Sequence, residues 1–286
     1  MRSPIRVVER ICNFDGALAY RRGQLFPNGF FELVVQLDEP HRLVDEATSP
    51  FPAICFDGLQ TETTTIEAPR GRFRALEIRP HPPGAFALLD ALLCDVADRS
   101  IDLRAAIRRP AAELADRLDE RHDGAARVWT AETWLRARLA RAHATDSIGG
   151  DVYARIRSDG GCVTLGQVDR LDGRSRSRFA QRFRQQIGLS PKRYARVVRF
   201  GRALELLGAA WTGTSLSALA LALAAGYYDQ AHVNADFREH AGITARRYLE
   251  ALRCPNGTHL AHAADGETTP GVFSKKPRSQ SRRIIA

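Results

Sequence analysis

Two short stretches of this chain nearly repeat each other: "FRQQIGLSPKRY" at residues 183–194 and "FREHAGITARRY" at residues 237–248. At a constant offset of 54, Phe183 corresponds to Phe237, Gly188 to Gly242 and Tyr194 to Tyr248. Self-similarity of this kind indicates that one supersecondary unit occurs twice in the chain. Both copies are rich in arginine, and this positive charge indicates that the units bind an anionic partner.

Each copy predicts a helix with one apolar side that ends at a glycine. The apolar positions recur every four residues: Phe179, Phe183 and Ile187, then Val233, Phe237 and Ala241. Ser175 and Asp229 stand where N-cap residues are expected, and the glycines that follow both helices can take the left-handed turn. Upstream of the second helix, "SLSALALALAAG" (215–226) completes a helix-turn-helix pattern. The corresponding stretch of the first copy, "VTLGQVDRLDG" (163–173), fits this pattern less well.

Positive charge is concentrated in the second half of the chain. The 286 residues carry a formal charge of +9, yet residues 1–125 hold 16 Lys and Arg against 20 Asp and Glu. Residues 150–253 hold 17 Lys and Arg against nine Asp and Glu, and no carboxylate lies between Asp172 and Glu205. Such a block repels itself unless it meets an anion, so nucleic acid is the expected partner; the alternative is a solvated basic surface.

The side of each repeated helix that faces away from the phenylalanines is expected to meet the base edges. On the first helix this side presents Ser177, Gln181 and Arg184, of which Gln181 can pair with adenine and Arg184 with guanine or a phosphate. On the second helix Ala231 and Ala235 offer only van der Waals contact, with His232 beside them. The first helix is therefore predicted to carry most of the base discrimination, and the second mainly to position the protein.

Basic side chains on the helices and on the turns after them are predicted to contact phosphates. A positive helix end and free backbone N–H groups favour a phosphate at each turn. The predicted phosphate-contacting residues are Arg176, Arg178, Lys192, Arg193, Arg196, Arg199, Arg238, Arg246 and Arg247. Some of the arginines between the copies could instead pair with Glu205 or with the front half of the chain.

The two stretches "GLSPKRYARVVRFGRAL" (188–204) and "ALAAGYYDQAHVNADFREHAGITARRYLEALR" (222–253) resemble the DNA-binding domain of AraC/XylS-type transcription regulators. The resemblance implies two helix-turn-helix units, joined by a long helix, that enter adjacent major grooves. It maps base reading onto Ser177, Gln181 and Arg184, then onto Gln230, Ala231, His232 and Ala235. This chain departs from the family pattern at Ala235, where an arginine is usual, and at Ala245, where a proline is usual.

The front half resembles the N-terminal domain of some of these regulators in "PNGFFELVVQL" (27–37), "FDGLQTE" (56–62) and "RPHPPGAFALLD" (79–90). That resemblance implies a cupin-like β-structure that senses a small molecule, dimerises, or does both. The residues agree, because 30–37, 53–59 and 73–80 are rich in β-branched and aromatic residues and are separated by turn residues. Helical periodicity follows at 84–98, 102–122 and 131–143.

These observations predict an α+β chain with an N-terminal β-rich, cupin-like domain and a C-terminal all-α domain that holds two helix-turn-helix motifs. The expected boundaries are 1–82 for the β-rich domain, 83–142 for a helical connector, 143–150 for a linker and 151–253 for the DNA-binding domain. Residues 254–286 are expected to form a disordered basic tail. The five cysteines form no CxxC pair and the longest apolar run is too short for a membrane span, so a cytoplasmic protein is expected.

The predicted function is regulation of transcription, with double-stranded DNA as the partner. A small-molecule effector, RNA polymerase and a second copy of the chain are further expected partners. No cofactor, metal site or catalytic residue is expected, because the front half lacks an HxH pair and the chain lacks a phosphate-binding glycine loop. Two alternatives stay open: an architectural DNA-binding protein with little sequence choice, and a cupin-type enzyme fused to a DNA-binding domain.

A substitution at Gln181 tests the assignment of base reading. Gln181→Ala is expected to relax the preference at a single base pair by about 1–3 kcal/mol, because a bidentate contact is lost. Exchange of Arg193 is expected to weaken binding to all sequences alike, since a phosphate contact carries no sequence information. Competition binding against single-base variants of the selected site measures both; a change of preference on exchange of Arg193 would contradict this sorting of contacts.

Overall fold

The computed structural model describes residues 8–18, 20–44, 50–140, 148–163, 176–211, 220, 223–253, 259–261 and 281–282. The front half holds β1 (Val8–Ala17), β2 (Arg22–Leu25), β3 (Glu32–Gln36), β4 (Arg42–Leu43), β5 (Ile54–Asp57), β6 (Thr64–Glu67) and β7 (Arg72–Pro80). The helices α1 (Pro82–Leu89), α2 (Leu103–Ile107), α3 (Arg109–Asp119) and α4 (Gly124–Leu139) follow, with a 3₁₀ turn at Leu93–Asp95 and strand β8 at Ser100–Asp102.

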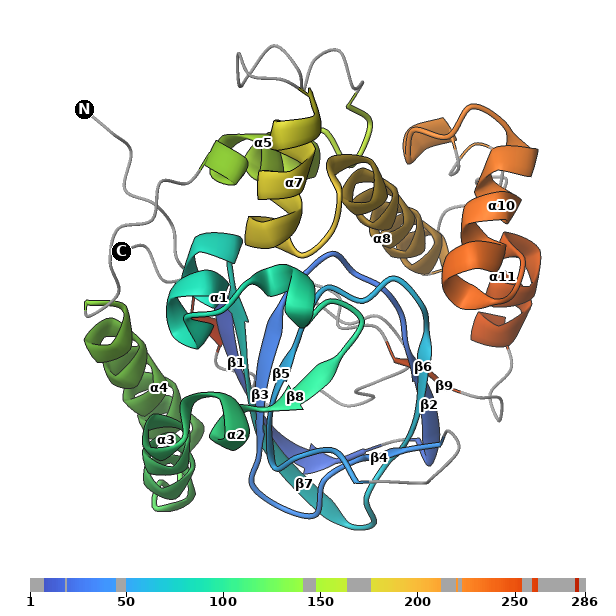
Figure 1. Ribbon diagram of the computed structural model, residues 1–286. Coiled ribbons are helices and arrows are strands. Elements are labelled where there is room, and N and C mark those ends of the chain that lie inside the picture. Colours follow the sequence, from blue (N-terminus) through green and yellow to red (C-terminus); the bar gives the residue numbers. More distant parts are fainter. Residues whose placement is uncertain are drawn as a thin grey trace.

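Two sheets face each other in the front half (Figure 1). One is six-stranded in the order β10-β1-β7-β3-β5-β8, where β10 is Ser281–Arg282, and the other is four-stranded in the order β4-β6-β2-β9, where β9 is His259–Ala261. The three strands predicted within 30–37, 53–59 and 73–80 are confirmed as β3, β5 and β7. The analysis of the sequence missed β1, although it makes the longest pairing in the sheet, Val8–Ala17 antiparallel to β7.

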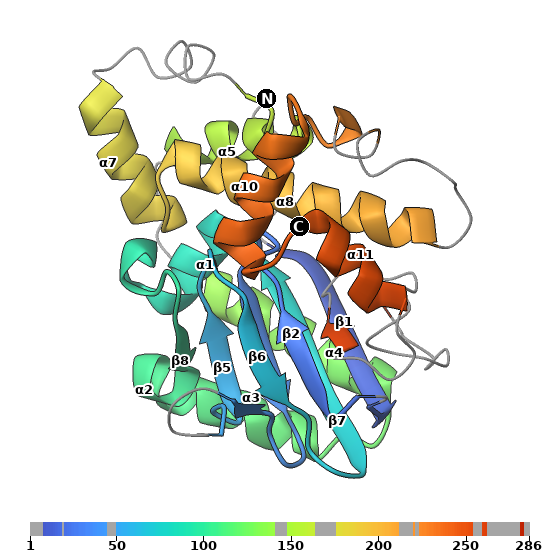
Figure 2. The ribbon, with the colours of Figure 1, turned by 90° about the vertical axis from the view of Figure 1, so that its right-hand side faces the viewer.

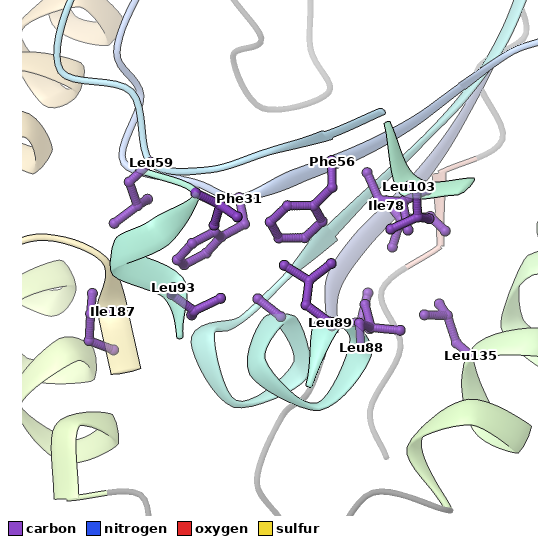
Figure 3. Packing of buried hydrophobic residues seen from close by; sticks show 14 of the residues in the cluster. Phe31, Phe56, Leu59, Ile78, Leu88, Leu89, Leu93, Leu103, Leu135 and Ile187 are labelled. Carbon is purple, nitrogen blue, oxygen red and sulfur yellow. The ribbon is translucent and has the colours of Figure 1, made fainter. Parts of the chain in front are cut away.

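The apolar side of the larger sheet packs against the helices and not against the smaller sheet. The side chains of Phe56 and Ile78 are completely buried and point toward α1, where Leu88 and Leu89 meet them (Figure 3). Because side chains alternate across a strand, Glu32, Asp57 and other polar residues of the same strands lie on the side toward the smaller sheet. The space between the two sheets is therefore lined with ionisable groups.

The segment predicted as a helical connector is more closely integrated than that description implies. It contributes β8 to the larger sheet, where Asp57 pairs with Ser100, and its helices share the sheet's hydrophobic core. The helix predicted over 102–122 is broken at Arg108, whose φ is 49°, because Pro110 interrupts the helical hydrogen bonding. The expected linker 143–150 stops before residue 148, because α5 (Ile148–Ser158) begins there.

Between residues 148 and 253, the described part of the C-terminal half is helical apart from turns. It comprises α5, α7 (Arg176–Ile187), α8 (Pro191–Trp211), α10 (Gln230–Ala241) and α11 (Ala245–Arg253). Short strands at His259–Ala261 and Ser281–Arg282 pair with β2 and β1, so these five residues are not the disordered tail that the composition predicts. The other residues of 254–286 lie outside the described part of the chain.

The two repeated units are packed differently. In the first, Phe179, Phe183 and Ile187 belong to the same continuous core as the sheet of the front half, and Ile187 faces Leu93 (Figure 3). At the end of α7, a side chain at Gly188 would place its Cβ 3.0 Å from the carbonyl oxygen of Leu93. The second unit has a core of its own, built around residues such as Phe200, Phe237 and Tyr248, to which the front half adds Phe26.

Candidate DNA-binding surface

The two repeated helices begin and end at corresponding residues. Helices α7 and α10 each have 12 residues, and both bounds differ by the predicted offset of 54. Their predicted apolar sides are buried: Phe183 is 1% exposed and Phe237 is fully covered. Gly188 and Gly242 end the helices with φ angles of 95° and 67°, the left-handed conformation that favours glycine. The helices lie on either side of α8 (Figures 1 and 2).

The polar side of α7 is exposed as predicted. Ser177, Gln181 and Arg184 are open to solvent, and so is Arg178 at the flank. Arg184 lies close enough to the front half for its charge to act on Cys94; burial and Asp95 nevertheless raise the pKa of that thiol. Ser175, the predicted N-cap, and the side chain of Arg176 lie outside the described part of the chain.

Helix α10 has the N-cap that the sequence predicts. The carboxylate of Asp229 accepts a hydrogen bond from the backbone N–H of His232 at 2.8 Å. Gln230, Ala231 and Ala235 are exposed, whereas His232 is half-buried. Arg238 is exposed as well, at the far end of the same helix. The outward side of α10 is thus poorer in hydrogen-bonding groups than that of α7.

Two of the predicted phosphate-contacting arginines are held by carboxylates of α10. Arg196 binds Asp236 at 2.6 Å and Glu239 at 2.5 Å, and Arg199 donates to Asp236 Oδ2 at 3.2 Å. Their side chains are 29% and 14% exposed, and their ion pairs connect α8 to α10. We call this set of ion pairs the tie between α8 and α10. The sequence contains the signal for this tie, because the arginines are three residues apart and so are the carboxylates. Sequence analysis considered other partners for these arginines.

Asp236 is the centre of this tie. The residue is 1% exposed, and burial by itself acts to raise the pKa of its carboxyl group. The hydrogen bond from Arg196 and the charges of Arg196 and Arg199 outweigh burial, so the pKa of Asp236 is lowered from its ordinary value. A buried carboxylate with two guanidinium partners fixes the rotation of α10 about its own axis relative to α8.

The basic residues of the turns are more open. Lys192, Arg246 and Arg247 are exposed, although Arg246 also pairs with Glu250 at 2.8 Å within its own helix. Arg193 is engaged by the front half: its Nη2 donates to Thr61 Oγ1 at 2.8 Å and lies 3.8 Å from the carboxylate of Asp98. An exchange of Arg193 therefore changes an internal contact as well as any phosphate contact, and exchange of Lys192 is the cleaner test.

The loop that holds Arg193 also contacts the end of α10. The Nδ1 atom of His240 lies 2.7 Å from the carbonyl oxygen of Thr61, and Thr63 Oγ1 donates to the carbonyl oxygen of His240 at 2.8 Å. Asp98 fixes the loop by accepting from the backbone N–H and the hydroxyl of Thr61, at 2.6 and 2.7 Å. One short loop thus touches both helix-turn-helix units, and no periodicity or motif in the sequence indicates these contacts.

Ionisable groups of the larger sheet form a buried network on the side toward the smaller sheet. Arg79 is 1% exposed and binds Glu77 at 2.6 Å and Glu32 at 3.1 Å. Burial raises the pKa of Glu32 to about 7 and that of Asp57 to about 6. Burial acts in the same direction on Glu77, but the charges of Arg79 and Arg10 outweigh it and lower the pKa of Glu77.

These features define the C-terminal half as a helix-turn-helix DNA-binding domain. Residues 172–251 match the family model described as a helix-turn-helix domain. This part of the chain is therefore an AraC-type helix-turn-helix domain, which confirms the resemblance found in the sequence. No curated protein matches the chain. No described helix is long and apolar enough to cross a membrane.

Solved structures of ToxT from Vibrio cholerae are similar to this chain at low sequence identity. One crystal form has 11% identity and a TM-score of 0.42, covering 85% of this chain and 98% of that chain. ToxT from Vibrio cholerae O395 has 9% identity and a TM-score of 0.45, covering 83% and 97%. ToxT with bound unsaturated fatty acid has 10% identity and a TM-score of 0.43, covering 87% and 97%.

The tie between α8 and α10 predicts a defined pH dependence of stability. Because the pKa of Asp236 is lower in the folded chain than its ordinary value of 3.8, its charge stabilises the fold fully above about pH 4. This contribution is lost as the pH falls through the folded pKa. Asp236→Asn is expected to lower the free energy of unfolding by about 3 kcal/mol at pH 7 and to flatten its dependence on pH below 4.

Denaturant unfolding between pH 3 and pH 7 measures both effects. Glu239→Gln is the matched control, since Glu239 binds the same arginine but is 48% exposed, and a loss below about 1 kcal/mol is expected. Equal losses for the two variants would show that burial of Asp236 does not strengthen the pair.

Proposed function

We propose that this chain is a sequence-specific, DNA-binding regulator of transcription whose front half controls its DNA-binding half. The observation that carries the proposal is the pair of helices α7 and α10, which have corresponding bounds, buried phenylalanines and exposed outer sides. The exposed side of α7 carries Ser177, Gln181 and Arg184, whose side chains can bind base edges or phosphates. The same kind of helix recurs after 54 residues, which fits two helices that bind one DNA duplex.

Helix α8 joins the two repeated helices into one rigid unit, which supports binding of both to one duplex. Its 21 residues span about 30 Å at 1.5 Å per residue, and α10 contacts it in its first half, at Arg196 and Arg199. Helix α7 precedes α8 directly, whereas α10 packs along it through the Arg196 and Arg199 contacts. In this proposal Gln181 and Arg184 supply most of the sequence discrimination, and α10 contributes fewer base contacts because Ala231 and Ala235 carry no polar group.

An architectural protein with little sequence choice is the second candidate, favoured by those same outward alanines of α10. Selection of fragments from a random DNA pool, followed by competition binding, distinguishes the two. A regulator is expected to prefer its selected site over random duplex by about 10³ or more. A ratio below about ten would support the architectural function and contradict ours. The dependence of affinity on salt reports the phosphate contacts in both cases.

The front half is proposed to control the geometry of the two DNA-binding units. Support comes from a path of contacts that starts between the two sheets, where Arg79 binds Glu32 and Glu77. The guanidinium group of Arg79 lies 4.6 Å from the centre of the Phe30 ring, and that of Arg157 on α5 lies 3.8 Å from it. The carbonyl oxygen of Gly29 accepts from Tyr194 of α8 at 3.3 Å.

A small molecule that displaces the buried charges between the sheets would move Phe30 and, through it, α5 and α8. This is the route by which we propose that an effector is sensed. A homodimer and a contact with RNA polymerase stay predictions; sedimentation of the protein with and without its selected DNA tests the first of them.

The loop at Thr61 is proposed to compete with DNA for Arg193. Asp98→Asn removes the charge opposite Arg193 and keeps the left-handed backbone conformation, φ 56°, that asparagine tolerates. The affinity for the selected site is expected to rise about two- to five-fold, as appropriate for a partly exposed ion pair. Fluorescence anisotropy at fixed salt measures the change.

Asp90→Asn is the matched control for this substitution. Asp90 also has a left-handed conformation, φ 53°, is exposed, and makes no ion pair among the described residues. Its substitution is expected to leave the affinity unchanged. An unchanged or lower affinity for the Asp98 variant would show that the contact does not compete with DNA.

A further inference from the structure

We propose that His232 binds DNA as a hydrogen-bond donor through its Nδ1 atom, and that Arg199 and Asp236 are positioning residues for this contact. The inference deepens the proposed function, on which it rests, and it assigns α10 a polar contact that its alanines cannot make. The acceptor is the N7 atom of a purine or an oxygen of the phosphate backbone. Both are acceptors that a donor at the start of a helix meets in the major groove.

The contact with Arg199 decides which nitrogen of His232 carries the proton. Arg199 Nη2 lies 3.2 Å from His232 Nε2. A guanidinium group has only donors, so the Nε2 atom of His232 must accept this hydrogen bond. In the neutral ring the proton is then on Nδ1, which makes Nδ1 a donor and excludes it as an acceptor.

Arg199 is itself held in place from two sides. Its Nη2 atom also donates to Asp236 Oδ2 at 3.2 Å, and its guanidinium group lies 4.9 Å from the centre of the Tyr227 ring. Asp236 is 1% exposed and is bound on its other side by Arg196 at 2.6 Å. The position of the Arg199 group therefore depends on a buried carboxylate and not on a mobile surface contact.

The ring of His232 is fixed as well. Tyr227 packs against it edge to face, with ring centres 5.1 Å apart and an angle of 83° between the planes. The backbone of His232 is bound by the N-cap Asp229. The Nδ1 atom makes no hydrogen bond with any described residue, and it is not among the buried polar atoms without a partner, so solvent reaches it. A donor of fixed direction at the beginning of α10 is thus available to DNA.

Two substitutions separate the donor from the shape of the ring. In His232→Asn the side-chain amide can place an N–H close to the position of Nδ1, whereas in His232→Gln it reaches the position of Nε2 instead. His232→Asn is therefore expected to retain binding to the selected site within about two-fold. His232→Gln and His232→Phe are expected to lose about three- to ten-fold, the range of one hydrogen bond. Thermal unfolding of each variant checks that the fold is intact.

Modified DNA identifies the acceptor. The selected site is prepared with a 7-deazapurine at each purine in turn, and separately with a methylphosphonate at each phosphate. For the unmodified protein, one of these changes is expected to weaken binding about three- to ten-fold. For His232→Phe the same change is expected to cost nothing further, because the donor is already absent. A 7-deazapurine effect assigns a base contact and a methylphosphonate effect a phosphate contact; either supports the donor assignment.

Arg199→Met tests the positioning role. Without Arg199 the proton of His232 is free to occupy Nε2. The fold-loss of affinity caused by the DNA modification is therefore expected to fall by at least half. This holds even where the overall affinity changes for other reasons. A purely structural role of Arg199 would lower the affinity for modified and unmodified DNA equally. Arg196→Met is the matched control, since Arg196 binds the same carboxylate but does not contact His232 in the described structure.

Two results overturn the inference and can be told apart. If a base-specific site is selected but every DNA modification weakens the binding of His232→Phe as much as that of the unmodified protein, the donor assignment is wrong while the proposed function stands. If no site is selected at all, the proposed function fails and this inference fails with it.

Discussion

Helix α8 is the constraint on which the rest of the structure depends. Its beginning packs into the core of the front half through residues such as Tyr194 and Val197, and its later turns form the core of the second unit through Phe200 and Leu204. An α-helix of 21 residues is stiff, so it holds the two units in a fixed position relative to each other.

The two units use this helix in different ways. Helix α7 is attached by apolar packing against the front half, where Ile187 meets Leu93 and Gly188 allows close approach to its carbonyl oxygen. Helix α10 is attached by charge as well, through Asp236 and the two arginines of α8. Apolar packing is insensitive to salt, whereas buried ion pairs depend on ionisation. The same repeated sequence is thus held in two environments, and the second is the one that pH and neighbouring charges can change.

The loop at Thr61 connects these environments. It binds Arg193 at the start of α8 and His240 at the end of α10, so the front half contacts both units through a few hydrogen bonds of modest strength. Contacts of this kind are strong enough to bias the orientation of the units and weak enough to be replaced by DNA. A second path of contacts runs from the buried charges between the two sheets through Phe30 to Arg157 of α5. In the proposed function this path connects the sensing of an effector to DNA binding.

Local periodicity in the sequence was enough to predict the two repeated helices and the class of the protein. Apolar positions four apart and a glycine after each helix were sufficient to place α7 and α10 and to predict their exposed sides, because helix periodicity depends on neighbours along the chain. The DNA-facing roles of Gln181 and Arg184 follow from the same pattern and stay predictions.

Only the tertiary structure decided the partners of the arginines. Arg193, Arg196 and Arg199 look alike in the sequence, yet one binds the front half and two bind Asp236. Strand β1 and the loop at Thr61 were likewise beyond prediction, since their partners lie far away along the chain. The physical reason is that an ion pair or a strand pairing depends on which residues the fold brings together, and no local spacing encodes that proximity.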